Sequence, residues 1–162
     1  MAIGNLSKTS IRVPMAGIVA SSAPNVLETL LGSCVGIAFW CQETRQGALA
    51  HTMLSDSQGC NKQPGRFVDT AIPEMLDQLA KSGARRRAIV AKLSGGSNMF
   101  KSSSTAHEVG RKNLDKAREL LRLNKIPILS QHVGGTSGRV IYFNLESGEI
   151  RVKIGLEFVA QI

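Results

Sequence analysis

Two side chains in the first third of the chain could together perform nucleophilic chemistry. Cys34 ends a small-residue turn, Gly32-Ser33-Cys34, and His51 lies seventeen residues further on, inside the apolar stretch GALAHTML. A cysteine is a useful nucleophile only as the thiolate, so it needs a base or a lowered pKa, and histidine is the usual base. Free backbone amides beside such a turn, at Gly32 and Ser33, could also form an oxyanion hole.

A third group normally orients the ring of a catalytic histidine. Thr29 precedes Cys34 by five residues, and its hydroxyl could share a hydrogen bond with the imidazole of His51. The same residues have a structural interpretation, because a cysteine beside apolar residues is most often a small core residue. A single histidine in a strand is likewise most often structural. Spacing therefore favours the structural interpretation for each residue taken singly and leaves the pair open.

Hydrophobic patterning predicts the elements that must carry these residues. Short apolar runs bounded by turn residues predict strands over 35–40, 48–54, 88–93 and 126–133, and a hairpin within 139–158. Apolar residues at helical spacing predict helices over 67–84 and about 105–123. The first two strands, if adjacent, would bring Cys34 and His51 within reach of each other. The order of elements indicates a mixed α/β or α+β domain with two main helices.

Glycines and arginines mark the connections between these elements. The pairs Gly95-Gly96 and Gly134-Gly135 are expected to form sharp turns with positive φ, although they could also border a substrate groove. The polar stretch 55–66 is expected to be a loop. The run 85–87, three arginines, is interpreted as a solvated loop and not as a binding patch.

Length and composition limit the class of protein. The 162 residues, 43% of them hydrophobic, suit one packed domain over 1–162. No apolar run approaches the roughly 20 residues of a membrane span, and the N-terminal segment makes a poor signal peptide, so we expect a cytoplasmic protein without membrane insertion. Three cysteines without a CxxC pair and three scattered histidines predict neither a disulfide framework nor a metal site.

The charge balance points to an acidic partner. The formal net charge is +8, which suits nucleic acid, an anionic membrane or an acidic protein. The basic residues are scattered, however, and no nucleic-acid-binding motif is recognisable. Nucleic-acid binding therefore rests on net charge alone and is not the expected function.

Several blocks of this sequence resemble the CheD family, the chemoreceptor glutamine deamidases of bacterial and archaeal chemotaxis. The resemblance covers roughly residues 11 to 155, in order, through the blocks TLLGSCVGIAFW, GALAHTMLSDS, RFVDTAIPEMLDQLAKSGA, AKLSGGSNMF, GRKN, IPILSQHVGGTSGR and GEIRVKI. It implies that Cys34 is the catalytic cysteine, His51 the catalytic histidine and Thr29 the catalytic threonine. It also implies a fold similar to that of the cytotoxic necrotising factor deamidases, α/β with two packed sheets and flanking helices.

The resemblance implies a protein-glutamine glutaminase. Such an enzyme hydrolyses glutamine side chains of chemoreceptor cytoplasmic domains to glutamate through a cysteine thioester, without a metal or organic cofactor. The alternative is a non-enzymatic adaptor that binds receptors or the phosphatase CheC. The joint presence of Cys34, His51 and Thr29 argues for chemistry, because an adaptor needs none of them. His132 stands just before the VGG turn, where the family often has an acidic residue, and we expect it to alter surface charge or the choice of partner without affecting the catalytic set.

Overall fold

The computed structural model describes residues 7–99 and 104–162. Its strands are β1 (Ser10–Arg12), β2 (Ile18–Ser22), β3 (Val26–Leu31), β4 (Val35–Cys41), β5 (Gln46–Thr52), β6 (Ile89–Gly95), β7 (Ile128–Val133), β8 (Arg139–Asn144), β9 (Ile150–Ile154) and β10 (Glu157–Gln161). Its α-helices are α1 (Val68–Lys81) and α2 (Ser104–Leu123), and single 3-10 turns lie at Pro64–Arg66 and Arg86–Ala88. In the described part of the chain, neither α-helix is long and apolar enough to cross a membrane.

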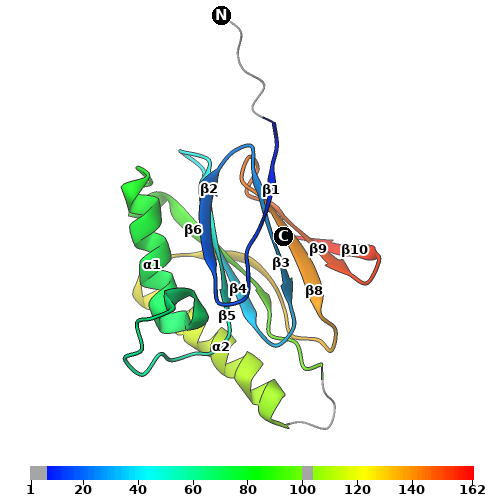
Figure 1. The fold of residues 1–162 in the computed structure, drawn as a ribbon. Coiled ribbons are helices and arrows are strands. Elements are labelled where there is room, and N and C mark those ends of the chain that lie inside the picture. Colours follow the sequence, from blue (N-terminus) through cyan, green and yellow to red (C-terminus); the bar gives the residue numbers. More distant parts are fainter. Residues whose placement is uncertain (1–6, 100–103) are drawn as a thin grey trace, which may run out of the picture.

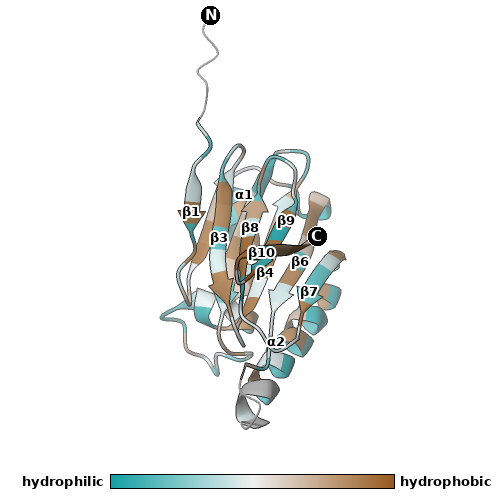
Figure 2. Ribbon diagram, turned by 90° about the vertical axis from the view of Figure 1, so that its right-hand side faces the viewer, coloured by the Kyte–Doolittle hydropathy of each residue, from teal (hydrophilic) through white to brown (hydrophobic). Residues whose placement is uncertain are grey.

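The strands form two five-stranded sheets, and both helices lie on the same side of the pair (Figure 1). Sheet A has the order β1-β3-β8-β9-β10, and sheet B has the order β2-β5-β4-β6-β7. Each sheet is mixed, because β1 pairs with β3 and β6 pairs with β7 in parallel while the other pairs are antiparallel. Seen from the side of sheet A, the helices lie behind both sheets (Figure 2). The predicted α+β class with two packed sheets and flanking helices is confirmed.

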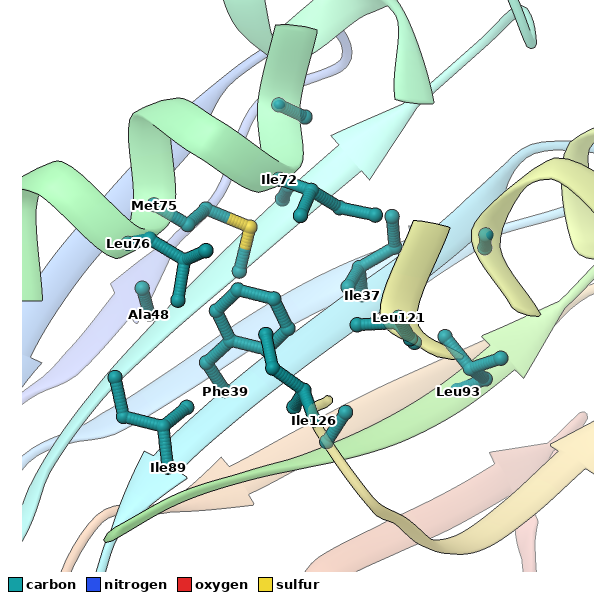
Figure 3. Close-up of a cluster of buried hydrophobic side chains, with 14 of the residues drawn as sticks. Ile37, Phe39, Ala48, Ile72, Met75, Leu76, Ile89, Leu93, Leu121 and Ile126 are labelled. Carbon is teal, nitrogen blue, oxygen red and sulfur yellow. The ribbon is translucent and has the colours of Figure 1, made fainter. Parts of the chain in front are cut away.

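Two hydrophobic cores hold these layers together. The core between the sheets includes Leu27, Leu31, Ala38, Leu49, Ile141 and Phe143. The core between sheet B and the helices includes Ile37, Phe39, Ile72, Met75, Leu93 and Leu121 (Figure 3). Strand β4 contributes to both cores, since successive side chains of a strand point to opposite faces. This explains why its sequence, VGIAFWC, is a continuous apolar run and not an alternating one.

The register of sheet B places His51 beside the cysteine turn, which consists of Gly32, Ser33 and Cys34. Strands β4 and β5 are antiparallel neighbours, and Gly36 lies opposite His51. Cys34 precedes β4 by one residue, so both functional candidates lie at the same end of this strand pair. The predicted helices are confirmed, with α1 ending at Lys81 rather than at 84. Gly83, in the left-handed region at φ +96, follows the helix end.

The N-terminal strands β1, β2 and β3 are the part of the fold that the hydrophobic patterning did not predict. Strand β3 nevertheless alternates, with Leu27 and Leu31 fully buried and Leu30 65% exposed. The strand β10 also extends beyond the predicted hairpin. These additions matter for function, because β3 carries Thr29.

Candidate active site

Thr29 reaches the space between the sheets from β3. Its side chain points inward, 4% exposed, because it follows the same alternation as Leu27 and Leu31. Its hydroxyl donates a hydrogen bond to the carbonyl of Val13 at 2.8 Å. The same oxygen lies 2.8 Å from Nδ1 of His51. A hydroxyl has one hydrogen, so Thr29 must accept at this second contact and the imidazole must donate.

His51 is thereby held in one tautomer. Its Nδ1–H donates across the sheets to Thr29, which leaves Nε2 as the nitrogen with the free lone pair. Nε2 is buried and has no hydrogen-bond partner among the described residues. Burial lowers the pKa of His51, because the charged imidazolium loses its hydration. The ring is therefore a neutral, oriented base with an unoccupied acceptor.

Cys34 and His51 line the same pocket. The pocket has a volume of about 280 Å³, and its lining consists of Met15, Leu30, Leu31, Gly32, Ser33, Cys34, His51, Met99 and Gly138. A larger hollow of about 440 Å³ on the outer face of sheet A contains neither a cysteine nor a histidine in its lining. Cys34 and His51 therefore meet at one pocket and Thr29 binds Nδ1 of the ring, while Nε2 of His51 makes no hydrogen bond to Cys34 in this structure.

The thiol of Cys34 is half-buried, and burial raises its pKa. Its own backbone amide lowers the pKa, as the smaller of the two effects. A raised thiol pKa and a lowered imidazole pKa favour the neutral pair over an ion pair. A thiol with a raised pKa is a weak nucleophile until a base removes its proton.

The cysteine turn is held in place by the turn Gly95–Asn98. The amide of Gly96 donates to the carbonyl of Cys34 at 2.8 Å, and the amide of Ser97 donates to the carbonyl of Gly32 at 3.0 Å. Gly95 has φ +100, and a Cβ at this position would collide with the carbonyl oxygen of Cys34. Only glycine tolerates both conditions. The predicted positive-φ turn is confirmed, but its role beneath the cysteine was missed.

The backbone around Cys34 offers donors to a developing negative charge. Gly32 and Ser33 both line the pocket. In residues 7–99 and 104–162, no backbone hydrogen bond engages the amides of Gly32, Ser33 and Cys34. Preorganised amides of this kind can stabilise an oxyanion, although the sequence alone could not say which ones were free.

The remaining cysteines lie away from the pocket. Cys41 is fully buried in the core between sheet B and the helices, and Cys60 is exposed in the loop before α1. Among the described residues, no group of three or more His, Cys, Asp or Glu side chains is arranged to hold a metal ion.

Comparisons with known proteins identify the family. Residues 53–154 match the family model described as CheD chemotactic sensory transduction. A protein of Methanococcus vannielii named probable chemoreceptor glutamine deamidase CheD is 40% identical over 148 residues, covering 91% of this chain and 96% of the relative. A Clostridium novyi protein of the same name is 36% identical over 153 residues, covering 91% of this chain and 94% of the relative. The chain therefore belongs to the CheD family.

Proposed function

We propose that the protein deamidates glutamine side chains of chemoreceptors, with Cys34 as nucleophile, His51 as general base and acid, and Thr29 as the residue that orients His51. The observation that carries this proposal is the hydrogen bond from His51 to Thr29, which leaves Nε2 unbonded on a ring that lines the same pocket as Cys34. The names of the relatives support the choice of a receptor glutamine as substrate.

The first half of the reaction forms a thioester. Nε2 of His51 takes the proton from Sγ of Cys34, and the thiolate attacks the carboxamide carbon of the glutamine. The amides of Ser33 and Cys34 stabilise the resulting oxyanion. His51 then gives its proton to the leaving nitrogen, the C–N bond breaks, and ammonia departs.

The second half hydrolyses the thioester. Nε2 of His51 removes a proton from water, and the hydroxide oxygen attacks the thioester carbon. Collapse of this intermediate breaks the C–S bond, releases a glutamate side chain and returns the proton to the sulfur of Cys34. One water is consumed and one ammonia is formed, so no redox step and no group carrier are required.

The rim of the pocket suits a protein substrate better than a free amino acid. Met15, Leu30 and Met99 surround the cysteine turn and are 62%, 65% and 48% exposed. Exposed apolar side chains around a reactive group are typical of a surface that another macromolecule covers. A receptor helix presenting a glutamine would bury them, and action on the cytoplasmic part of a receptor requires a cytoplasmic enzyme.

Mass spectrometry tests the proposal directly. A purified receptor cytoplasmic fragment is incubated with the wild-type protein, with Cys34→Ala and with Cys60→Ser, which removes an exposed loop thiol as a matched control. We expect conversion of glutamine to glutamate with the wild type and with Cys60→Ser, and none with Cys34→Ala. Equal conversion by Cys34→Ala would refute the assignment of the nucleophile. Binding without conversion by the wild type would favour the adaptor function instead.

A further inference from the structure

Arg139 is unusual among the charged residues that the structure describes. It is 2% exposed, and no other lysine, arginine, aspartate or glutamate in residues 7–99 and 104–162 is buried. None of the ion pairs formed within this part of the chain includes it. A buried charge without an opposite charge is costly unless hydrogen bonds replace its hydration. Its contacts should therefore reveal what it stabilises.

The guanidinium group binds the segment that connects β7 to β8. Nη1 donates to the carbonyl of His132 at 2.7 Å and lies 2.7 Å from Nδ1 of the same residue. Nη2 donates to the carbonyls of Gly134 and Ser137. The ring of His132 is half-buried and contacts Arg139. One side chain of sheet A thus fixes the end of a strand of sheet B.

The connecting segment in turn holds the turn Gly95–Asn98. The amide of Gly134 donates to the carbonyl of Gly95 at 2.9 Å, and the amide of Asn98 donates to the carbonyl of Gly135 at 2.8 Å. The turn Gly95–Asn98 is the one that binds the carbonyls on either side of Ser33, as described above. A continuous series of backbone hydrogen bonds therefore leads from the guanidinium to the cysteine turn.

The start of β8 approaches the same place from the other side. Arg139 lies opposite Leu31, the residue before Gly32, in the register of β3 and β8. Gly138 lines the pocket together with Cys34. The cysteine turn is therefore enclosed by segments that Arg139 either belongs to or binds.

We propose that Arg139 is a positioning residue for the deamidation: its guanidinium fixes the connecting segment and the turn Gly95–Asn98, and through them the geometry of Cys34. The kinetic part of this inference rests on the proposed function. Arg139 touches no reacting atom. Lysine cannot replace it, because a planar guanidinium presents several donors in a fixed fork, whereas an ammonium is a single point charge.

The test compares Arg139→Ala and Arg139→Lys with Arg118→Ala. Arg118 is a matched control, since it donates to Gln131 on the same strand β7 but is only partly buried. We expect Arg139→Ala to lower kcat on a receptor fragment about 10- to 100-fold, since small misplacements of reacting groups have effects of this size. KM should stay within about twofold because the rim of the pocket is untouched. Arg139→Lys should recover little, and added guanidinium or ethylguanidinium should restore part of kcat to Arg139→Ala.

Hydrogen exchange provides a second measurement that needs no substrate. The amides of Gly96, Ser97 and Asn98 should exchange faster in both Arg139 variants, while the amides of β4 and β5 keep their protection. Unchanged kcat or unchanged local exchange would overturn the proposal, and so would faster exchange throughout the sheets with no local excess. If Arg139→Ala does not fold, the same criteria apply to Arg139→Lys. If the wild type itself fails to deamidate, the proposed function falls while the exchange data still decide whether Arg139 positions the turn.

Discussion

The hydroxyl of Thr29 has a specific task that its hydrogen bonds define. Because it donates to the carbonyl of Val13, it can only accept from His51, and this fixes the tautomer of the ring. Thr29→Val keeps the shape but removes the acceptor, so Nδ1–H of His51 loses its partner. We expect kcat to fall about 10- to 100-fold, a part of what a general base contributes.

The matched variant for this prediction is Thr29→Ser, which keeps the hydroxyl and should retain most of the activity. Both proteins should show the same secondary structure by circular dichroism. A rate for Thr29→Val close to that of the wild type would remove Thr29 from the mechanism and leave it a role in packing only.

The buried His51 and the half-buried His132 should make the stability of the folded protein sensitive to acid. Burial lowers the pKa of His51 below its ordinary value of about 6.5. Burial and the nearby charge of Arg139 lower the pKa of His132 in the same direction. Below about pH 6.5 the unfolded chain therefore binds more protons than the folded one, and the free energy of unfolding decreases as the pH falls through this range.

His132→Asp isolates the contribution of His132. Arg139 is the charged group that faces its ring, and Ser94 of β6 donates to its carbonyl. A carboxylate beside a guanidinium stays ionised to low pH, so the variant should lose less stability than the wild type between about pH 7.5 and about pH 5. Urea unfolding at several pH values measures this, with His107→Gln as a control for removal of a histidine. Parallel curves for wild type and His132→Asp would contradict it.

The sequence supplied the candidate residues but not their geometry. Cys34 and His51 could be paired because their strands are neighbours along the chain and the apolar runs that form them are clear. Thr29 meets His51 across the two sheets, and sequence spacing contains no information on which strands face each other. The resemblance to the family named Thr29, while the folded structure showed what it binds. The interior position of Arg139 was missed because an arginine in a strand is normally solvated.

At the scale of elements, buried strands were easier to predict than edge strands. Strand β4 is covered on both faces and has a continuous apolar sequence, so its position was predicted closely. Strand β1 has three residues at a sheet edge and strand β2 is only partly buried, so neither has a strong hydrophobic pattern. Strand β3 could have been found by the alternation in VLETLL.

The glycine turn below the cysteine provides a prediction at this scale. Gly95→Ala introduces both an unfavourable positive φ and a collision with the backbone of Cys34. We expect the free energy of unfolding to fall by about 1–3 kcal/mol, because strain of this kind has that cost. We also expect kcat to fall, because the cysteine turn must move. Gly83→Ala is the matched control, since Gly83 has φ +96 with nothing within 4 Å.

Comparison of the two variants separates the effect of backbone strain on stability from the effect of a displaced cysteine turn on kcat. Gly83→Ala should lose stability through strain at the end of α1 but keep its kcat, because the site is untouched. Chemical denaturation and receptor deamidation are measured on the same preparations. Equal kcat values for the two variants would mean that the turn Gly95–Asn98 does not control the position of Cys34.

At the scale of the whole molecule, the excess of positive charge has a kinetic consequence. Lysine and arginine number 20 against 12 aspartate and glutamate residues, for a formal net charge of +8. If the substrate is an acidic receptor segment, long-range attraction speeds the encounter, and salt screens this attraction over about 10 Å at 0.1 M ionic strength. We therefore expect kcat/KM to decrease as salt is added, while kcat, which reports steps after binding, stays constant.

The salt titration also discriminates between the sources of affinity. As salt increases, apolar contacts at the pocket rim strengthen or stay constant; the rim consists of Met15, Leu30 and Met99. Long-range electrostatic attraction between enzyme and substrate weakens under the same conditions. Stopped-flow association with a receptor fragment, measured from low salt to about 0.5 M, separates the association rate from the dissociation rate. If the association rate does not change with salt concentration, the apolar rim and not the net charge is responsible for substrate recognition. In that case the basic composition would have no part in substrate selection, and Met99→Ser should then reduce affinity more than any change of an exposed arginine.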